Sequence, residues 1–353
     1  MKKIIALVLA LMIIMSMTAC GAKPAETTPA APAATEAPAA AAEPAGDVKT
    51  YKVGVAIYQY NDNFMTLYRQ EIENYFKTLE TDTVKYEVTM VDGKNDMGEQ
   101  TNQIDTFITQ KMDVIICNLV QTSSAEVIID KVVAAGIPLV LINREPLGDD
   151  GDESYPGIIN NPTVCYVGAD ARQSGTYQGE IVLALPNKGD INGDGVVSYV
   201  MVVGDPENPD AQYRTEYSIK ALTDAGVQVK ELVKNVGNWD QTKGQEIVAA
   251  ALTQYGDEIE VVFCNNDGMA LGAAAAIEAA GRKVGEDIYL LGVDALDECQ
   301  EMVQKGTMTG TVLNDHIGQS HKAVDVAIQA LNGEPIDNYS WVDYVKVDAS
   351  YFG

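Results

Sequence analysis

Apolar and polar positions alternate in blocks along residues 50–353. Short apolar runs rich in β-branched residues alternate with longer stretches in which apolar positions recur at helical spacing. The short runs lack a polar face, as expected for strands of a parallel sheet that is covered on both sides. They predict strands at Tyr51–Tyr58, Tyr86–Val91, Val114–Val120, Pro138–Ile142, Val164–Gly168, Tyr199–Val203, Val227–Val233, Val261–Asn265, Ile288–Val293 and Met308–Leu313.

The longer stretches predict the helices between these strands. They are Asn63–Thr78, Met97–Gln110, Ala125–Ala135, Asp170–Leu185, Asp210–Ala225, Asp240–Tyr255, Asp267–Ala280 and Asp315–Leu331. Repeated alternation of strand and helix predicts an α/β fold with doubly wound parallel sheets. About 300 residues exceed one hydrophobic core, so we expect two such lobes.

The first residues of the chain have the pattern of an export signal. Lys2 and Lys3 precede an apolar run over 4–15, and small residues precede Cys20. The run is shorter than the ~20 residues that span a bilayer, which disfavours a retained membrane helix. Residues 17–20, Met-Thr-Ala-Cys, resemble the lipobox of bacterial lipoproteins, in which the cysteine becomes the lipid-carrying first residue. We therefore expect a signal peptide over 1–19 and lipidation at Cys20.

A low-complexity segment separates this signal from the predicted fold. Residues 20–49 consist mostly of Ala, Pro, Thr and Glu, and such a segment cannot bury enough apolar surface to fold. It predicts a disordered tether that joins a folded protein outside the cytoplasm to a lipid anchor in the cell membrane.

The charge balance limits the possible partners. The chain has 24 Lys and Arg against 51 Asp and Glu, a net charge of −27, which becomes −29 once residues 1–19 are removed. Nucleic acid is an unsuitable partner because its binding needs clustered cations. An anionic membrane surface repels the folded part, so only the lipid anchor would contact it. Much of the acidity has a simpler explanation as a solvated surface that keeps the protein soluble.

The remaining cysteines and the histidines predict no metal chemistry. Cys117, Cys165, Cys264 and Cys299 are far apart and lie in apolar patterns, so we expect them in the core, although one disulfide is conceivable in an exported protein. The chain has two histidines, five residues apart and on different helix faces, which disfavours zinc.

Polar and aromatic residues follow most of the predicted strands. Each Asn or Asp taken alone is explained by an ordinary helix N-cap. Together, however, they collect where ligands bind in open parallel sheets, at the carboxyl ends of the strands. Planar amide, carboxylate and guanidinium groups with aromatic rings are typical of sites for neutral sugars. The residues are Asn61-Asp62-Asn63-Phe64, Asn118, Asn143-Arg144-Glu145, Asp210 with Arg214, Trp239, Asn265-Asn266-Asp267, Asp294 and Asn314-Asp315.

These residues resemble the galactose/glucose-binding branch of the bacterial periplasmic sugar-binding proteins, the periplasmic binding protein type I family. The resemblance covers 51–353, and its most specific blocks, in order, are 54–65, 204–214, 265–270, 292–296 and 310–315. It implies two lobes, 50–160 plus 316–338 and 161–315 plus 339–353, joined by strands that cross near 160, 315 and 338. It also implies a monomer that captures a monosaccharide by closure of this hinge and delivers it to the permease of an ABC importer.

The resemblance also assigns roles to individual residues. It implies that Phe64 and Trp239 cover the two faces of a pyranose ring, and that Asp62 accepts a hydrogen bond from the 4-hydroxyl. The other groups around the sugar are Asn118, Asp210, Arg214, Asn266, Asp294 and Asn314. The family has a histidine where this chain has Asn208, which also enters the site but has a different reach, so the exact sugar stays open.

One loop has the spacing of a calcium site. Asp190, Asn192, Asp194 and Ser198 occupy positions 1, 3, 5 and 9 of an EF-hand-like loop, with the main-chain carbonyl of Val196 at position 7. Position 12 is not Glu, so the residues alone fit an Asx-rich turn equally well. The resemblance implies that Glu260 supplies the missing carboxylate and that the calcium ion is structural. Ser198 replaces the family's glutamine.

Three other functions are compared with sugar import. An enzyme is disfavoured because the chain has no nucleophile elbow, P-loop or zinc-protease motif, and its carboxylates are interleaved with Asn and Arg. A transcriptional regulator is disfavoured because the region before residue 50 predicts export. A sugar sensor that presents its closed form to a chemoreceptor or histidine kinase stays open, because such a partner would read the same closed form.

Overall fold

The computed structural model of the protein describes residues 48–148 and 155–353. The predicted signal peptide, Cys20 and nearly all of the predicted tether lie outside these residues. Within them, no helix is both long enough and apolar enough to cross a membrane.

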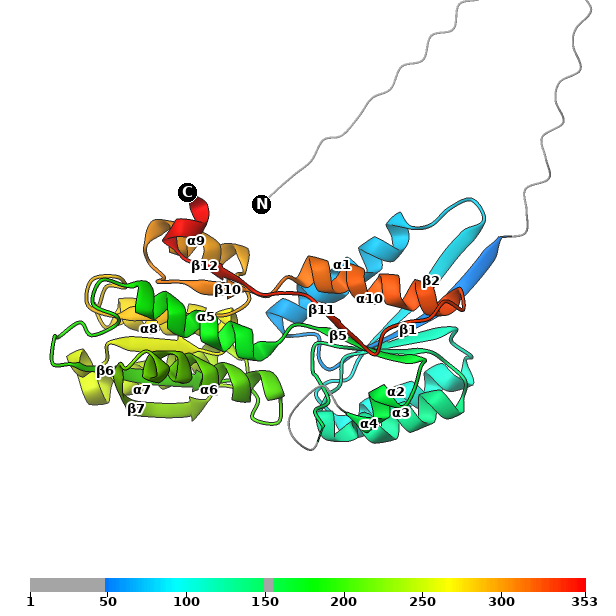
Figure 1. Ribbon diagram of the computed structural model, residues 1–353, viewed down its shortest axis with the longest axis horizontal. Coiled ribbons are helices and arrows are strands. Elements are labelled where there is room, and N and C mark those ends of the chain that lie inside the picture. The colour runs from blue at the N-terminus through cyan, green and yellow to red at the C-terminus, as the bar shows by residue number, and fades with distance from the viewer. Residues whose placement is uncertain (1–47, 149–154) are drawn as a thin grey trace, which may run out of the picture. The chain divides into compact units, whose positions relative to one another are not determined.

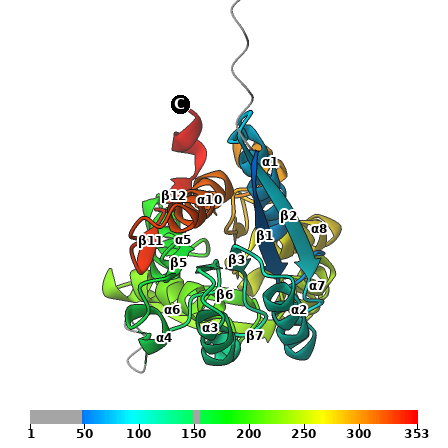
Figure 2. The same ribbon diagram turned by 90° about the vertical axis from the view of Figure 1, so that its right-hand side faces the viewer.

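The first sheet contains six parallel strands in the order β11-β5-β4-β3-β1-β2. These are β1 (Lys49–Ile57), β2 (Val84–Asp92), β3 (Val114–Cys117), β4 (Leu139–Ile142), β5 (Val164–Gly168) and β11 (Tyr339–Trp341). Helices α1 (Asn63–Thr78) and α10 (His316–Leu331) cover one face, and α2 (Met97–Thr109), α3 (Ala125–Ala134) and the short α4 (Pro156–Ile159) cover the other (Figures 1 and 2).

The second sheet contains four parallel strands in the order β7-β6-β8-β9. These are β6 (Val196–Val203), β7 (Gln228–Val236), β8 (Val261–Cys264) and β9 (Tyr289–Leu291). Helices α5 (Ala171–Ala184) and α6 (Pro209–Asp224) pack on one face, and α7 (Gln241–Tyr255), α8 (Asp267–Ala279) and α9 (Asp297–Lys305) on the other. Strands β10 (Thr311–Leu313) and β12 (Val345–Val347) form an antiparallel pair beside β9, and 3₁₀ turns occur at Thr122–Ser124, Gly256–Glu258 and Ala349–Phe352.

Local sequence explains how each element begins and what it buries. Helix α1 begins after Asp62, whose carboxylate accepts a hydrogen bond of 2.7 Å from the main-chain N–H of Met65. Its buried face, which includes Ile72 and Phe76, packs against Val53 and Val55 of β1. Each such side chain contributes about 1.5–3 kcal/mol on burial, so the helical and strand periodicities together fix the layered core.

The elements agree well with those expected from the sequence. Every predicted strand and helix is present, with ends shifted by at most three residues. The elements β11, β12, α4 and α9 are additional. The cysteine prediction is confirmed: Cys117, Cys165, Cys264 and Cys299 are all buried and free. Burial raises the pKa of the Cys117 and Cys165 thiols to about 12.

The lobe boundaries differ from those predicted. Strands β5 and β11 were expected in the second lobe, but both belong to the first sheet, where Tyr339 pairs with Tyr166. The chain therefore passes between the lobes after Gly168 and after Trp341, instead of near 160 and 338. Asn160 and Asn161, at the expected first crossing, instead form the turn between α4 and β5. The third crossing, between β10 and α10, lies where the sequence predicted it.

Candidate ligand-binding site

A cavity lies between the two sheets, at the carboxyl ends of their strands. It contains about 320 Å³ of unfilled space, part of it open to solvent. Most of its walls are carboxylate, amide, guanidinium or aromatic groups. The lining residues are Tyr58, Asp62, Phe64, Met65, Asn143, Arg144, Asn208, Asp210, Arg214, Trp239, Asn266, Asp294 and Asn314.

The sequence-predicted binding residues nearly all reach this cavity. Asp62, Phe64, Asn208, Asp210, Arg214, Trp239, Asn266, Asp294 and Asn314 all line it. Asn118 does not. Its amide donates to the carbonyl of Ile142 at 3.1 Å and to Asn143 Oδ1 at 3.2 Å, and its oxygen accepts from the N–H of Tyr58 at 3.3 Å. Asn118 therefore lies one layer behind the wall and positions Tyr58 and Asn143, which line it.

Four lining residues had no predicted contact with the sugar: Tyr58, Met65, Asn143 and Arg144. Asn143 and Arg144 follow β4 directly and were among the strand-end polar residues expected near the ligand. Tyr58 ends the first predicted strand, and Met65 lies in the first turn of α1, where its apolar character suggested only a core position.

Several predicted residues are helix caps and cavity walls at once. Asp62, Asn208 and Asn266 cap α1, α6 and α8 by accepting main-chain N–H hydrogen bonds. A carboxylate or amide oxygen can accept more than one hydrogen bond, so a capping role leaves capacity for a ligand. The ordinary explanation and the functional one therefore apply to the same side chains.

A buried charge network forms the second-lobe wall. Arg214, 3% exposed, pairs with Asp210 at 3.0 Å and donates to the carbonyl of Asn265 at 2.9 Å and to the Tyr344 hydroxyl at 3.0 Å. Burial raises the pKa of Asp210 above its usual range, and the positive charge of Arg214 opposes that rise. Such a paired, hydrogen-bonded network keeps planar polar groups fixed at the cavity.

Three lining residues have backbone conformations that side chains rarely adopt. The φ angles are 63° at Asn143, 67° at Trp239 and 127° at Asp294. Asp294 is kept in place by a 2.8 Å hydrogen bond from its N–H to the carbonyl of Val312 and by Asn314, which donates to its carboxylate at 3.3 Å. Residues in such conformations collect at functional sites because the surrounding structure must maintain them.

The indole ring of Trp239 fits in place only because residue 204 is a glycine. A Cβ atom added at Gly204, just after β6, would lie 2.1 Å from the indole of Trp239. The ring therefore rests directly on the backbone of the β6 loop. Across the cavity, Phe64 packs edge-on against Tyr68, with ring centroids 5.8 Å apart. Each lobe thus supplies one firmly placed aromatic ring.

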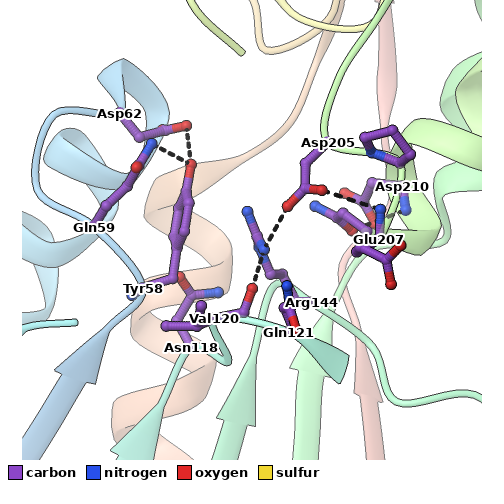
Figure 3. A network of polar contacts seen from close by, with 12 residues as sticks. Tyr58, Gln59, Asp62, Asn118, Val120, Gln121, Arg144, Asp205, Glu207 and Asp210 are labelled. Atoms are coloured by element: carbon purple, nitrogen blue, oxygen red, sulfur yellow. Dashed lines mark hydrogen bonds and ion pairs between the residues drawn. The ribbon is translucent and has the colours of Figure 1, made fainter. Parts of the chain in front are cut away.

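Arg144 connects the two lobes (Figure 3). It is 1% exposed, its guanidinium lies 3.9 Å from the centre of the Tyr58 ring, and it pairs across the cleft with Asp205, after β6, at 3.1 Å. It also donates to the carbonyl of Val120. The hydroxyl of Tyr58 in turn donates to Asp62 at 2.7 Å. Burial, and then the charge of Asp62, raise the pKa of this hydroxyl well above its usual value.

Two buried N–H groups at the cavity have no protein partner. Among the described residues, the Nε atoms of Arg144 and Arg214 are fully buried and make no hydrogen bond. Buried donors are nearly always paired, since an unpaired one costs about 1–3 kcal/mol. Both guanidinium groups line the same cavity, so a ligand with acceptor oxygens fits the observation.

The predicted calcium loop is a series of turns closed by side-chain-to-backbone hydrogen bonds. Asp190 accepts from the N–H groups of Gly193 and Gly195 at 2.7 and 3.0 Å, and both glycines have positive φ. Asn192 and Asp194 each accept from the N–H two residues further on. Glu260, from the other side of the loop, accepts from Ile191 and Asn192 through one oxygen and from Ser198 through the other, at 2.7–3.0 Å.

All the candidate ligand atoms of this loop are oxygens, which suits calcium. A carboxylate oxygen that accepts a single main-chain N–H keeps a further lone pair, whereas Oε1 of Glu260 accepts two. Across residues 48–148 and 155–353, however, no group of three or more His, Cys, Asp or Glu side chains is placed to bind a metal ion. A cation in this loop would therefore depend on amide and main-chain oxygens as well as on carboxylates.

Comparisons with known proteins place the chain in a family. The family model of the periplasmic binding protein domain matches residues 53–335. The chain belongs to this family. It is 34% identical over 316 residues to the D-galactose/methyl-galactoside binding periplasmic protein MglB of Haemophilus influenzae, covering 86% of this chain and 91% of that protein. A putative rhizopine-binding protein of Rhizobium meliloti is 30% identical, over 84% of this chain and 89% of the relative.

Solved structures agree with this assignment. An ABC transporter solute binding protein of Bacillus halodurans with bound myo-inositol superimposes with a TM-score of 0.73 at 28% identity, covering 86% of this chain and 96% of that one. The predicted family and the two-lobed α/β fold are thus confirmed. The family consists of solute-binding proteins of the extracytoplasmic space, so this periplasmic binding protein captures a solute and does not catalyse a reaction.

Proposed function

We propose that this periplasmic binding protein captures one monosaccharide, similar to galactose or glucose, and delivers it to the permease of an ABC importer. The observation that carries the proposal is the cavity itself. Its walls combine three carboxylates, several amides and two arginines with Phe64 and Trp239. Vicinal hydroxyls exchange paired hydrogen bonds with such planar groups, and aromatic rings cover the C–H faces of a sugar. The buried Nε–H groups of Arg144 and Arg214 have no protein partner, and the hydroxyl oxygens of a sugar can act as hydrogen-bond acceptors for them.

Capture works by closure of the two lobes. Asp62, Phe64 and Arg144 approach the ligand from the first lobe, and Asp210, Arg214, Trp239, Asn266 and Asp294 from the second. Three segments connect the lobes, after β5, β10 and β11, so bending there changes their separation. A sugar that contacts both walls binds the closed form better than the open one and shifts the population toward it. The importer then recognises the closed form.

The choice of sugar depends on the cavity wall around Asn208. This residue caps α6 through a 3.0 Å hydrogen bond from the N–H of Asp210, and its amide reaches the cavity. An amide and an imidazole differ in reach and in the number of donors. The named ligands of similar proteins, a galactoside, ribose and myo-inositol, are polyhydroxylated, so the test panel begins with galactose and glucose and also includes myo-inositol and ribose.

We further propose that the loop at 190–198 binds a structural calcium ion. Asp190, Asn192, Asp194, Ser198 and Glu260 would supply side-chain oxygens, and Val196 its main-chain carbonyl. The support is the all-oxygen donor set and the approach of Glu260 to the loop. Such an ion would fasten α5, β6 and the turn before β8 together without taking part in sugar binding.

The last proposal concerns the membrane. Cys20, in a lipobox-like sequence, would carry the lipid, and residues 20–49 would tether the folded lobes to the cell membrane. Labelling of cells with a radioactive fatty acid tests this, with Cys20→Ala as the control that should lose both the label and the membrane association.

A thermal-shift screen of the purified protein, residues 21–353, tests the proposed ligand. D-Galactose, D-glucose, myo-inositol and D-ribose are each added at millimolar concentration. Binding to the folded state alone raises the melting temperature. A shift with at least one of these compounds supports the proposal. Unchanged melting with all of them, in protein that melts cooperatively, would contradict it.

A further inference from the structure

A second chamber lies beside the cavity. One sugar ring bound in the cavity would leave this chamber empty. The chamber, with about 740 Å³ of unfilled space, shares the walls Tyr58, Asp62, Arg144 and Trp239 with the inner cavity. On the same measure the inner cavity has about 320 Å³. The two spaces therefore adjoin each other, and the larger one, part of it open to solvent, is called the outer chamber below.

The outer chamber has its own polar lining. Five carboxamides border it, from Gln59, Asn61, Asn95, Gln121 and Asn238, together with the carboxylates of Asp205 and Asp240. They come from loops after β1, β2, β3, β6 and β7, so both lobes contribute. Carboxamides donate and accept hydrogen bonds without carrying charge, which suits neutral hydroxyl groups.

The charges around the outer chamber disfavour an anionic ligand. Its one cationic side chain among the described residues, Arg144, is paired with Asp205 at 3.1 Å, while Asp62 and Asp240 add negative charge. A phosphate or carboxylate placed here would meet unpaired carboxylates and no free cation, and like charges at close range disfavour binding. A neutral, hydroxylated group is compatible with this lining.

Arg144 is a wall residue common to the two spaces. It lines both, and its guanidinium is fixed by Tyr58, Val120 and Asp205, as Figure 3 shows. Its buried Nε–H has no partner among the described residues. An acceptor at this point would satisfy it, and the bridging oxygen or an adjacent hydroxyl of a glycoside is such an acceptor.

We infer that the outer chamber is a second subsite, which binds the neutral, hydroxylated group attached to a sugar in the inner cavity. The ligand would then be a glycoside or disaccharide as well as a free monosaccharide. This inference rests on the proposed sugar-binding function and extends it.

The test compares free sugars with their extended forms by titration calorimetry. The probes are D-galactose and D-glucose, their methyl α- and β-glycosides, and the disaccharides lactose, melibiose, cellobiose and maltose. We expect at least one disaccharide to bind within about tenfold of the affinity of its free non-reducing sugar, since new hydrogen bonds offset the cost of ordering the second ring.

A double variant, Asn61→Ala with Gln121→Ala, locates the effect. Both side chains border only the outer chamber, and neither makes a side-chain hydrogen bond that stabilises the described fold. The variant should weaken that disaccharide by about fivefold or more and the free sugar by less than about twofold. Gln329→Ala, on the exposed side of α10, is the matched control and should change neither affinity.

The possible outcomes separate the two proposals. If a free sugar binds but no disaccharide does within about a hundredfold, the chamber is only a solvent-filled mouth of the cleft and the second subsite is wrong. The same holds if the double variant weakens free sugar and disaccharide equally. If none of these probes binds and no compound of the thermal-shift screen does either, the proposed sugar-binding function itself fails.

Discussion

The cleft and the loop at 190–198 contain the same kinds of residue but arrange their hydrogen bonds differently. In the loop, Asp190, Asn192 and Asp194 each accept from main-chain N–H groups two to five residues further along the chain. In the cleft, Arg144 pairs with Asp205 between the lobes and Arg214 pairs with Asp210 within α6, and the Nε atoms of both arginines stay unpaired in a buried place.

The polar residues of the loop therefore stabilise the fold, whereas the buried arginines of the cleft have donors left for a ligand. A loop whose polar atoms are satisfied by its own backbone is stable before anything binds. A buried wall with spare donors gains free energy only when a ligand supplies acceptors. Mutations in the cleft should therefore change affinity, and mutations in the loop should change stability.

The largest expected effect is at Trp239. Trp239→Ala removes the aromatic wall that rests on Gly204, and sugar affinity should fall by about 3 kcal/mol, because the ring's buried apolar contact with the ligand is lost. Titration calorimetry measures it. The other tryptophan, Trp341 on β11, lies outside the cavity, so Trp341→Ala should bind normally. Equal affinities of the two variants would contradict the site.

Substitutions of Asp62 test whether one residue both contacts the ligand and stabilises the fold by capping α1. Asp62→Ala removes a ligand contact and the cap of α1, so we expect affinity to fall by about 2 kcal/mol and stability by about 1 kcal/mol. Asp62→Asn keeps a capping oxygen and should lose affinity while stability stays nearly unchanged. Calorimetry and urea unfolding measure the two effects, and identical behaviour of both variants would contradict the dual role.

Glu260 tests the loop by itself. This residue is 1% exposed and accepts three main-chain N–H groups, so Glu260→Ala should lower the free energy of unfolding by about 1.5 kcal/mol. Sugar affinity, measured on the same folded protein, should stay the same. A large loss of sugar affinity with an unchanged free energy of unfolding would contradict the purely structural role of the loop.

Two buried acids, Asp294 in the cavity wall and Asp267 outside the lining, predict a pH dependence of stability. Burial raises the pKa of Asp267 and that of Asp294 above their usual values. The folded protein therefore binds more protons than the unfolded chain above the usual Asp pKa of about 4, and the contribution of these groups to stability falls as pH rises through that range. Asp267→Asn removes this titration, so the stability difference from the unmutated protein should shift in favour of the variant between pH 4 and pH 7. A difference that is constant across this range would contradict the assignment.

Calcium is expected to have the smallest effect, because the loop is already closed by its own hydrogen bonds. Addition of a chelator should lower the melting temperature by a few degrees, since an ion that binds only the folded state stabilises it by mass action. Glu260→Gln should abolish this shift, and sugar binding should not change in either case. Identical melting curves with calcium and with chelator would contradict the metal site.

Much of the fold was predictable because its signals are local. Apolar runs and helical periodicity identified all the strands of the two parallel sheets except β11. Strands β11 and β12 have three residues each, and their pairing is decided by distant partners, Tyr166 for Tyr339 and Thr311 for Val347. The lobe boundaries were wrong because both lobes repeat the same βα pattern, so the residues at a crossing carry no distinctive signal.

The site was predictable to a similar degree and for related reasons. Its residues follow strands, and the topology alone brings strand ends together. What the sequence could not reveal is the layer in which a side chain lies. Asn118 and Arg144 both follow strands, yet Asn118 connects β1 and β4 behind the wall, whereas Arg144 crosses the cleft to Asp205.

A crystal structure of the protein with D-galactose, or with whichever sugar of the panel raises the melting temperature most, tests the central claim most directly. We expect one sugar ring between Phe64 and Trp239, with its oxygens accepting hydrogen bonds from the Nε atoms of Arg144 or Arg214, while the side-chain hydrogen bonds of the loop at 190–198 to its main chain stay as they are. A sugar bound elsewhere, or one in the cavity that leaves both Nε atoms without a partner, would contradict the account.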